Sequence, residues 1–320
     1  MRTAALIAFL GLVAAAQEPS PLELVQTIPL SKVEGRIDHL AYDPKAQTLV
    51  VAALGNNTVE VLDLAAGKVV HQIPGHQEPQ GVLSVNGEIV VTSGGDGSCR
   101  FYDGATDKQT KIVDCKGDAD NVRYDAAAKR VYVGYGSGGL AVIDPEKGVK
   151  VGDIKLDGHP ESFQLETKGT RIFVNVPGSA HIAVADREKG AVVAKWKLSA
   201  QSNFPMALDE EGHRLFVGCR TPSRLLVFDT GSGKEVATVE CSGDTDDVFY
   251  DAPSKRVFVS CGAGFLDVFD AMGPTPKRTG KVSTAAGART CLYVAELGKL
   301  YLAVPHRGSQ PSEVRVYKAR

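Results

Sequence analysis

The sequence predicts an all-β fold built from repeats, and three features of the chain carry that prediction. An aspartate ends an apolar, strand-like run about every 41 residues, at Asp63, Asp103, Asp144, Asp186, Asp229 and Asp270. The runs are rich in Val, Ile, Phe and Tyr, and turns containing Gly, Asp, Asn and Pro separate them. They lack clean polar–apolar alternation, as expected of sheets covered on both faces. A strand-based repeat of this period predicts a β-propeller.

The first repeat shows the four strands of one unit, which we expect at residues 37–42, 48–52, 58–62 and 69–73. Seven such units follow one another, but the seventh ends after its third strand, at residues 313–317. Residues 24–29 match the fourth strand of the first unit, and adding them to the last unit would leave no half-built blade. The sequence therefore predicts a seven-bladed β-propeller of four-stranded antiparallel blades, in which an N-terminal strand completes blade 7.

The second and third strands of the repeat also carry a family resemblance. Residues 130–134 followed by 140–144, and 57–63 followed by 67–70, resemble the YVTN-type β-propeller repeat family. The resemblance covers residues 24–318, although the nearest match to the literal motif is Tyr-Val-Gly-Tyr at 132–135. It implies an exported propeller, and such proteins include surface or periplasmic binding proteins as well as enzymes.

The N-terminus predicts export. Arg2, an apolar stretch over residues 4–13 and three alanines at 14–16 form a signal peptide, with cleavage expected before Gln17. That stretch is too short to span a bilayer, so we expect no transmembrane segment. Residues 17–320 then form a single propeller domain, which we expect to be monomeric and periplasmic or extracellular. A net charge of −2 without a basic cluster gives no support for a nucleic-acid partner.

Six cysteines in an exported chain have two interpretations, disulfide formation or burial as small apolar side chains. The sequence alone does not choose between them. The cysteines are Cys99, Cys115, Cys219, Cys241, Cys261 and Cys291.

The polar residues divide into a structural set and a functional set. Aspartates that precede turns, such as Asp63, accept backbone N–H bonds, so we assign them to turn geometry. We expect a second set at one mouth of the central channel, because the starts of the first strands and the loops between second and third strands open on the same face. This set comprises Asp38, His39, Gln80, Asp120, Asn121, Glu161, Ser162, Asn203, Asp246, Asp247, Arg289, Asn56, Asn57, Tyr135, Asn175, His181, Arg220, Arg224, His306 and Arg307.

Three interpretations of this mouth stay open. The groups could be solvated or paired with Arg289 and Arg307. They could form a site for a hard cation such as Ca²⁺ or Mg²⁺, with Asp38, Asp120, Glu161 and Asp246 as ligands beside Asn121. They could also hydrolyse an ester or lactone, with His39 or His306 as the base and Arg289 or Arg307 holding an anionic substrate.

We expect a binding or interaction protein that takes a small molecule or a protein at the mouth, because no complete catalytic set is identifiable. The expected ligand-binding residues are Asn121, Arg220, Arg289, His306 and Arg307. The alternative is a metal-assisted hydrolase or lactonase at the same mouth. A quinone-dependent dehydrogenase has little support, since Tyr135 and Phe204 are the only aromatic residues there. We expect His159 beside the mouth, and His71, His76 and His213 at the surface.

Overall fold

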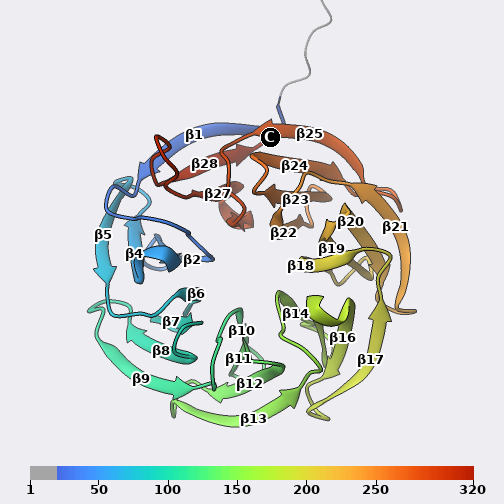
Figure 1. Cartoon of the computed structure of the whole chain (residues 1–320), viewed down its shortest axis with the longest axis horizontal. Coiled ribbons are helices and arrows are strands. Elements are labelled where there is room, and N and C mark those ends of the chain that lie inside the picture. Colours follow the sequence, from blue (N-terminus) through green and yellow to red (C-terminus); the bar gives the residue numbers. More distant parts are fainter. Residues whose placement is uncertain (1–19) are drawn as a thin grey trace, which may run out of the picture.

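The computed structural model describes residues 20–320 and confirms the predicted fold class. Seven four-stranded antiparallel sheets form the blades of a ring around a central channel, as Figure 1 shows. The expected signal peptide, residues 1–16, lies outside the described residues. Within residues 20–320, no helix has the length and apolar character needed to cross a membrane.

Each blade runs outward from the channel in chain order. Blade 1 contains β2 (Leu40–Asp43), β3 (Thr48–Ala53), β4 (Thr58–Asp63) and β5 (Lys68–Ile73). Blade 2 contains β6 (Pro79–Val85), β7 (Glu88–Ser93), β8 (Ser98–Asp103) and β9 (Gln109–Asp114). Blade 3 contains β10 (Val122–Asp125), β11 (Arg130–Tyr135), β12 (Gly139–Asp144) and β13 (Val149–Lys155). Blade 4 contains β14 (Phe163–Leu165), β15 (Arg171–Val176), β16 (His181–Asp186) and β17 (Ala191–Lys197). Blade 5 contains β18 (Gln201–Asp209), β19 (Arg214–Thr221), β20 (Ser223–Asp229) and β21 (Lys234–Glu240). Blade 6 contains β22 (Thr245–Asp251), β23 (Arg256–Cys261), β24 (Phe265–Asp270) and β25 (Lys277–Ser283). Short 3₁₀ turns lie at η1 (Leu54–Asn56), η2 (Pro177–Ser179) and η3 (Ala295–Leu297).

Blade 7 joins the two ends of the chain. It contains β26 (Cys291–Val294), β27 (Lys299–Val304) and β28 (Glu313–Ala319), and the N-terminal strand β1 (Leu22–Pro29) forms its outer edge. β1 pairs antiparallel with β28, with Ile28 opposite Val314, and Figure 1 shows the two strands side by side. The predicted closure is therefore confirmed, with the strand beginning two residues before the predicted start. Because the ring is closed, the first strands of all seven blades lie around one central axis.

The hydrophobic core lies between neighbouring blades. For example, Leu49 of blade 1 packs in one cluster with Tyr301 of blade 7, and Phe216 of blade 5 packs with Val257 of blade 6. Both faces of each blade thus meet apolar neighbours. This packing explains why the inner strands of the sequence read as continuous apolar runs.

The turn aspartates have the structural role expected of them. Asp63 Oδ1 accepts hydrogen bonds from the backbone N–H groups of Ala65 and Ala66, both at 2.8 Å. Asp144 and Asp186 repeat the arrangement in later blades. These carboxylates satisfy turn donors and are not aimed at a site.

The six cysteines and His76 also lie in the buried interior. All six cysteines are buried free thiols, which agrees with the small-apolar interpretation. The surface position expected for His76 is wrong, because its ring is buried between Ser93 Oγ and the Tyr102 hydroxyl, each 3.2 Å from a ring nitrogen. Burial, the largest effect, lowers the pKa of His76 to about 4, so it is a neutral core residue.

Candidate functional site

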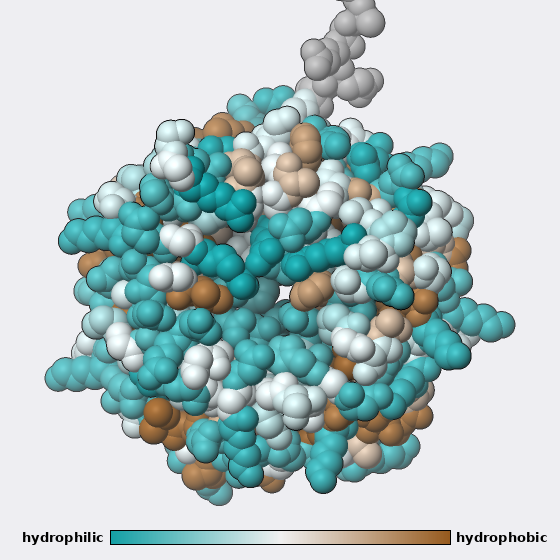
Figure 2. All heavy atoms as spheres, in the orientation of Figure 1, coloured by the Kyte–Doolittle hydropathy of each residue, from teal (hydrophilic) through white to brown (hydrophobic). Residues whose placement is uncertain are grey.

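One residue from the start of each first strand reaches a cavity of about 240 Å³ at one mouth of the channel. Each of these residues stands two positions before a buried core residue, so the seven are equivalent places in the repeat. We call them the mouth ring, which consists of Asp38, Gln80, Asp120, Glu161, Phe204, Asp246 and Arg289. Arg36, His39, Asp118, Asn121, His159, Ser162 and Arg220 complete the lining. In Figure 2, mostly hydrophilic side chains surround the opening of the channel on the face shown.

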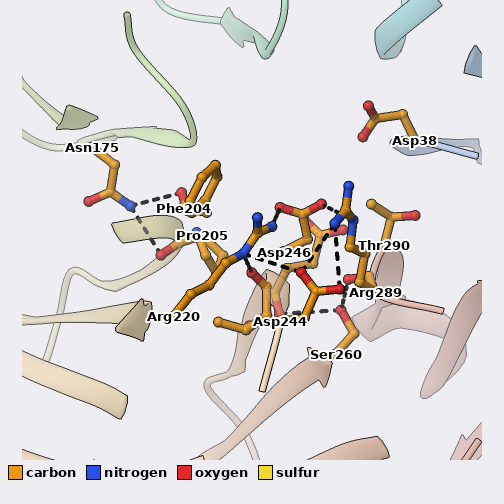
Figure 3. Close-up of polar contacts among 12 residues, drawn as sticks. Asp38, Asn175, Phe204, Pro205, Arg220, Asp244, Asp246, Ser260, Arg289 and Thr290 are labelled. Carbon is orange, nitrogen blue, oxygen red and sulfur yellow. Dashed lines mark hydrogen bonds and ion pairs between the residues drawn. The ribbon is translucent and has the colours of Figure 1, made fainter. Parts of the chain in front are cut away.

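One side of the mouth is a balanced network of arginines and aspartates, drawn in Figure 3. One carboxylate oxygen of Asp246 accepts a hydrogen bond from Arg220 Nη2, and the other lies 2.9 Å from Arg289 Nε. Arg289 Nη1 also lies 3.1 Å from Asp244 Oδ1. The Arg220 guanidinium covers the Phe204 ring, 3.7 Å from its centre. Burial raises the pKa of Asp246 to about 7 although the arginines oppose it. These charges neutralise one another.

His39 is a cation within this site. Its Nδ1 lies 3.6 Å from Asp247 Oδ1 and its Nε2 lies 3.8 Å from Asp38 Oδ1. Burial alone would lower the pKa of His39, but Asp247, Asp38 and Asp120 outweigh burial and raise it to about 10. The ring is therefore an imidazolium at neutral pH and has no lone pair with which to act as a base.

Asn121 lies between His39 and Asp120. The Asn121 amide nitrogen stands 3.3 Å from His39 Nε2, while the buried amide oxygen has no partner. An imidazolium donates from both ring nitrogens, so it cannot accept from an amide N–H. The amide nitrogen therefore donates to Asp120 Oδ1, 3.4 Å away, and not to His39.

The opposite side of the mouth is acidic. The ligand atoms of Asp120, His159 and Glu161 all lie within 4.8 Å of one another. His159 Nδ1 donates to the backbone carbonyl of Gly136 at 2.7 Å, and its Nε2 lies 3.8 Å from Asp120 Oδ2. Asp118 adds a third carboxylate, with Oδ2 3.4 Å from His159 Nδ1. Together, Asp120, His159 and Glu161 can hold a metal ion.

The pKa values of Glu161 and His159 are both raised. Burial raises the pKa of Glu161 to about 8, and the charge of Asp120 adds to that effect. Burial alone would lower the pKa of His159, but the carboxylates around it and its bond to Gly136 raise it to about 9. Both groups therefore hold a proton at neutral pH, and a metal ion that binds here would displace these protons.

The structure brings together only part of the predicted site. Asp120 and Glu161 of the expected cation ligands meet His159, whereas Asp246 is held by two arginines and Asp38 accepts from Arg36 Nη2 at 2.9 Å. In Figure 3, Asp38 stands apart from Asp246. Asn121, Arg220 and Arg289 line the cavity, and their role in ligand binding stays a prediction.

Ten of the 20 residues expected at the mouth do not line this cavity, and His306, Arg307 and Asn203 are among them. His306 Nδ1 pairs with Glu34 Oε2 at 2.8 Å, and the Arg307 guanidinium lies against Gly287, so the described lining of the cavity contains neither. Asn203 is fully buried and donates to Asn175 Oδ1, because a β-bulge between Asn203 and Met206 presents Phe204 instead.

Arg36, Asp118 and the full role of His159 were missing from the sequence-based site. All three lie in connections between blades, two positions before a mouth-ring residue: Arg36 before Asp38, Asp118 before Asp120, and His159 before Glu161. The identical offset of two positions in three blades was the signal that could have found them.

No protein-family model matches the sequence, and no curated protein matches it. Solved structures do match. One is a chain of the structure titled "Crystal Structure of Mitotic Checkpoint Complex", with a TM-score of 0.79, 12% identity and coverage of 98% of both chains. Another is Kuenenia stuttgartiensis hydrazine synthase, with a TM-score of 0.73, 15% identity and coverage of 92% of this chain and 96% of that chain. At such identities the similarity shows the β-propeller fold, a fold commonly used as an interaction scaffold.

Proposed function

We propose that this propeller is a binding protein whose mouth holds a cation on its acidic side. One observation carries the proposal: three carboxylates, from Asp118, Asp120 and Glu161, surround a single imidazole, while the arginines of the mouth are committed to other acids. A metal ion that displaces the proton of His159 would meet carboxylates that no guanidinium neutralises.

A divalent metal ion fits this group best. His159 is anchored through Nδ1–H to a backbone carbonyl, which is how proteins commonly orient a metal-binding histidine for coordination through Nε2. Metal bonds to nitrogen and oxygen of about 2.1 Å each can bridge the 3.8 Å between Nε2 and Asp120 Oδ2. An imidazole beside two carboxylates favours Zn²⁺ or Mn²⁺ over the Ca²⁺ or Mg²⁺ expected from carboxylates alone.

The arrangement supports binding more than hydrolysis. A metal-assisted hydrolase at this mouth would benefit from a neutral base, but the carboxylates around His39 keep it protonated, and His306 pairs with Glu34 away from the cavity. A basic side chain of a partner protein is the alternative occupant of the acidic side, since its ammonium or guanidinium group would meet the same carboxylates.

Metal analysis and thermal melts test the proposal. Purified protein dialysed against Zn²⁺ or Mn²⁺ is expected to retain about one ion per chain, and saturation at 100 times Kd adds about 2.7 kcal/mol to the free energy of unfolding. Asp120→Asn and Glu161→Gln should each abolish retention and the shift with chelator. Glu211→Gln, an exposed acid far from the mouth, is the matched control. Retention by both mouth variants, or no retention by the parent protein, would contradict a metal at this site.

We further propose that the protein acts as an exported monomer related to the YVTN-type repeat proteins. The signal-peptide pattern and the strand repeat support this proposal. Cell fractionation with N-terminal sequencing should find the mature chain beginning at Gln17 outside the cytoplasm, and light scattering should give the mass of one chain. A retained N-terminus in the cytoplasm would contradict export.

A further inference from the structure

A second and larger cavity, of about 620 Å³, occupies the channel beyond the mouth. Its lining includes one residue from each blade that stands three positions after the mouth-ring residue, so these seven are again equivalent places in the repeat. We call them the channel ring, which consists of Ala41, Leu83, Arg123, Gln164, Ala207, Phe249 and Leu292. Five of these side chains are apolar, one is an amide and one is a guanidinium.

Arg123 is the exception in this ring because its charge has no acidic partner. Its Nη1 donates to the backbone carbonyl of Val122 at 2.8 Å, and its guanidinium lies 5.6 Å from the centre of the Phe163 ring. Among residues 20–320, no carboxylate oxygen comes within 4.0 Å of its nitrogens. A guanidinium has five N–H donors, so several of those on Arg123 remain free for a ligand.

The groups nearest to Arg123 are already engaged. Asp247 Oδ2 accepts the backbone N–H of Cys291 at 2.8 Å, and Oδ1 faces His39. Gln164 donates its side-chain amide to the carbonyl of Met206 at 2.9 Å. Burial lowers the pKa of Arg123, although Asp247 and Asp120 oppose that effect. The channel therefore contains a cation that the fold itself leaves without a counter-ion.

We propose that this channel binds a small organic anion with an apolar body, whose carboxylate pairs with Arg123. A planar guanidinium matches a carboxylate in a bidentate pair. The body of the ligand would lie against Leu83, Phe249 and Leu292 in a cavity whose volume is within the usual range of small-molecule sites, about 300–1,000 Å³.

Aromatic residues extend the same wall toward the end of the channel away from the mouth. Tyr42, Tyr250 and Tyr293 occupy equivalent positions one residue farther along their strands, and all three line the cavity. Pro44 and Glu296, which follow β2 and β26, also line it, so the cavity reaches the face opposite the mouth. We assign this face as the side from which the anion enters.

The two cavities are distinct binding sites. His39 lines both and stands between them, with Asp38 on the mouth side and Asp247 on the channel side. The mouth would take a cation and the channel an anion. The proposed anion site does not depend on the proposed metal site, so an experiment can contradict either proposal without contradicting the other.

Calorimetric titration with hexanoate, compared with neutral hexanamide, tests the channel site. We expect saturable one-to-one binding of hexanoate, and binding of hexanamide at least tenfold weaker, because the amide has no charge to pair with Arg123. Arg123→Met keeps the length of the side chain and removes its charge, and should weaken hexanoate binding at least tenfold. Arg130→Met removes a cation from the same blade that pairs with Asp144, and should bind like the parent protein.

A second variant keeps the test decisive if Arg123→Met does not fold. Arg123→Lys retains the charge but loses the bidentate fork, and should bind hexanoate with intermediate affinity. Hexanoate binding should be the same with and without a metal chelator, which separates this site from the proposed metal. Equal binding of hexanoate and hexanamide, undiminished binding by both Arg123 variants, or no binding by the parent protein would overturn the proposal.

Discussion

The mouth and the channel are built by the same seven strands, three residues apart, and yet they treat charge in opposite ways. Six of the seven mouth-ring side chains are polar, while five of the seven channel-ring side chains are apolar. At the mouth, Arg220 and Arg289 share Asp246, whereas Arg123 in the channel has no carboxylate within 4.0 Å among the described residues. The paired arginines are thus part of the structure, and the unpaired one is free for a ligand.

Asp246→Ala gives the largest effect that this comparison predicts. The change leaves Asp244 as the one acid that Arg220 and Arg289 still share, and removing one partner of a buried pair costs about 3–5 kcal/mol. We expect the free energy of unfolding, measured by urea titration, to fall by about 3 kcal/mol. This is the lower end of the range, because the mouth is partly open to water. Glu23→Ala, which breaks an exposed pair with Arg320, should cost under about 0.5 kcal/mol. Equal losses in the two variants would show that the mouth network is only surface charge.

His39→Gln should remove an alkaline loss of stability. The folded-state pKa of His39 is raised from 6.5 to about 10, so its contribution is fully present below pH 6.5 and is lost as the pH rises toward 10. The slope has an upper limit of about 1.4 kcal/mol per pH unit. Denaturant titrations from pH 6 to 10 should show a smaller slope for the variant, with the two proteins converging near pH 10. Parallel curves would contradict a charged His39.

Arg123→Met should have the smallest effect on stability and the opposite sign from Asp246→Ala. Removing an unpaired, desolvated cation leaves no acid without a partner, so we expect the free energy of unfolding to stay the same or rise by up to about 1 kcal/mol. Thermal melts at low salt measure the difference. A loss above about 2 kcal/mol would mean that Arg123 has a structural partner and is not available to an anion.

The repeat made much of the fold predictable. Turn aspartates and apolar runs recur in register, and the match between residues 24–29 and 69–73 was enough to predict the closing strand. The mouth ring followed from the same register, since six of its seven residues are in the predicted mouth set. In each case the chain itself repeats the information.

The pairing of side chains within the mouth was not predictable in this way. Register places Asp246 and Asp120 in equivalent positions, but only side-chain direction decides that one meets two arginines and the other an imidazole. The bulge that buries Asn203 and exposes Phe204 also breaks the register. Arg123 was absent from the predicted site because that site contained only strand starts and the loops between second and third strands. It is nevertheless the one charged residue at its position in the repeat.

Anomalous diffraction from crystals grown with Mn²⁺ tests the cation at the mouth most directly. The account predicts one strong peak within about 2.2 Å of ligand atoms from Asp120, His159 and Glu161. A mouth without such a peak, or a peak beside the arginine-paired Asp246 instead, would contradict it.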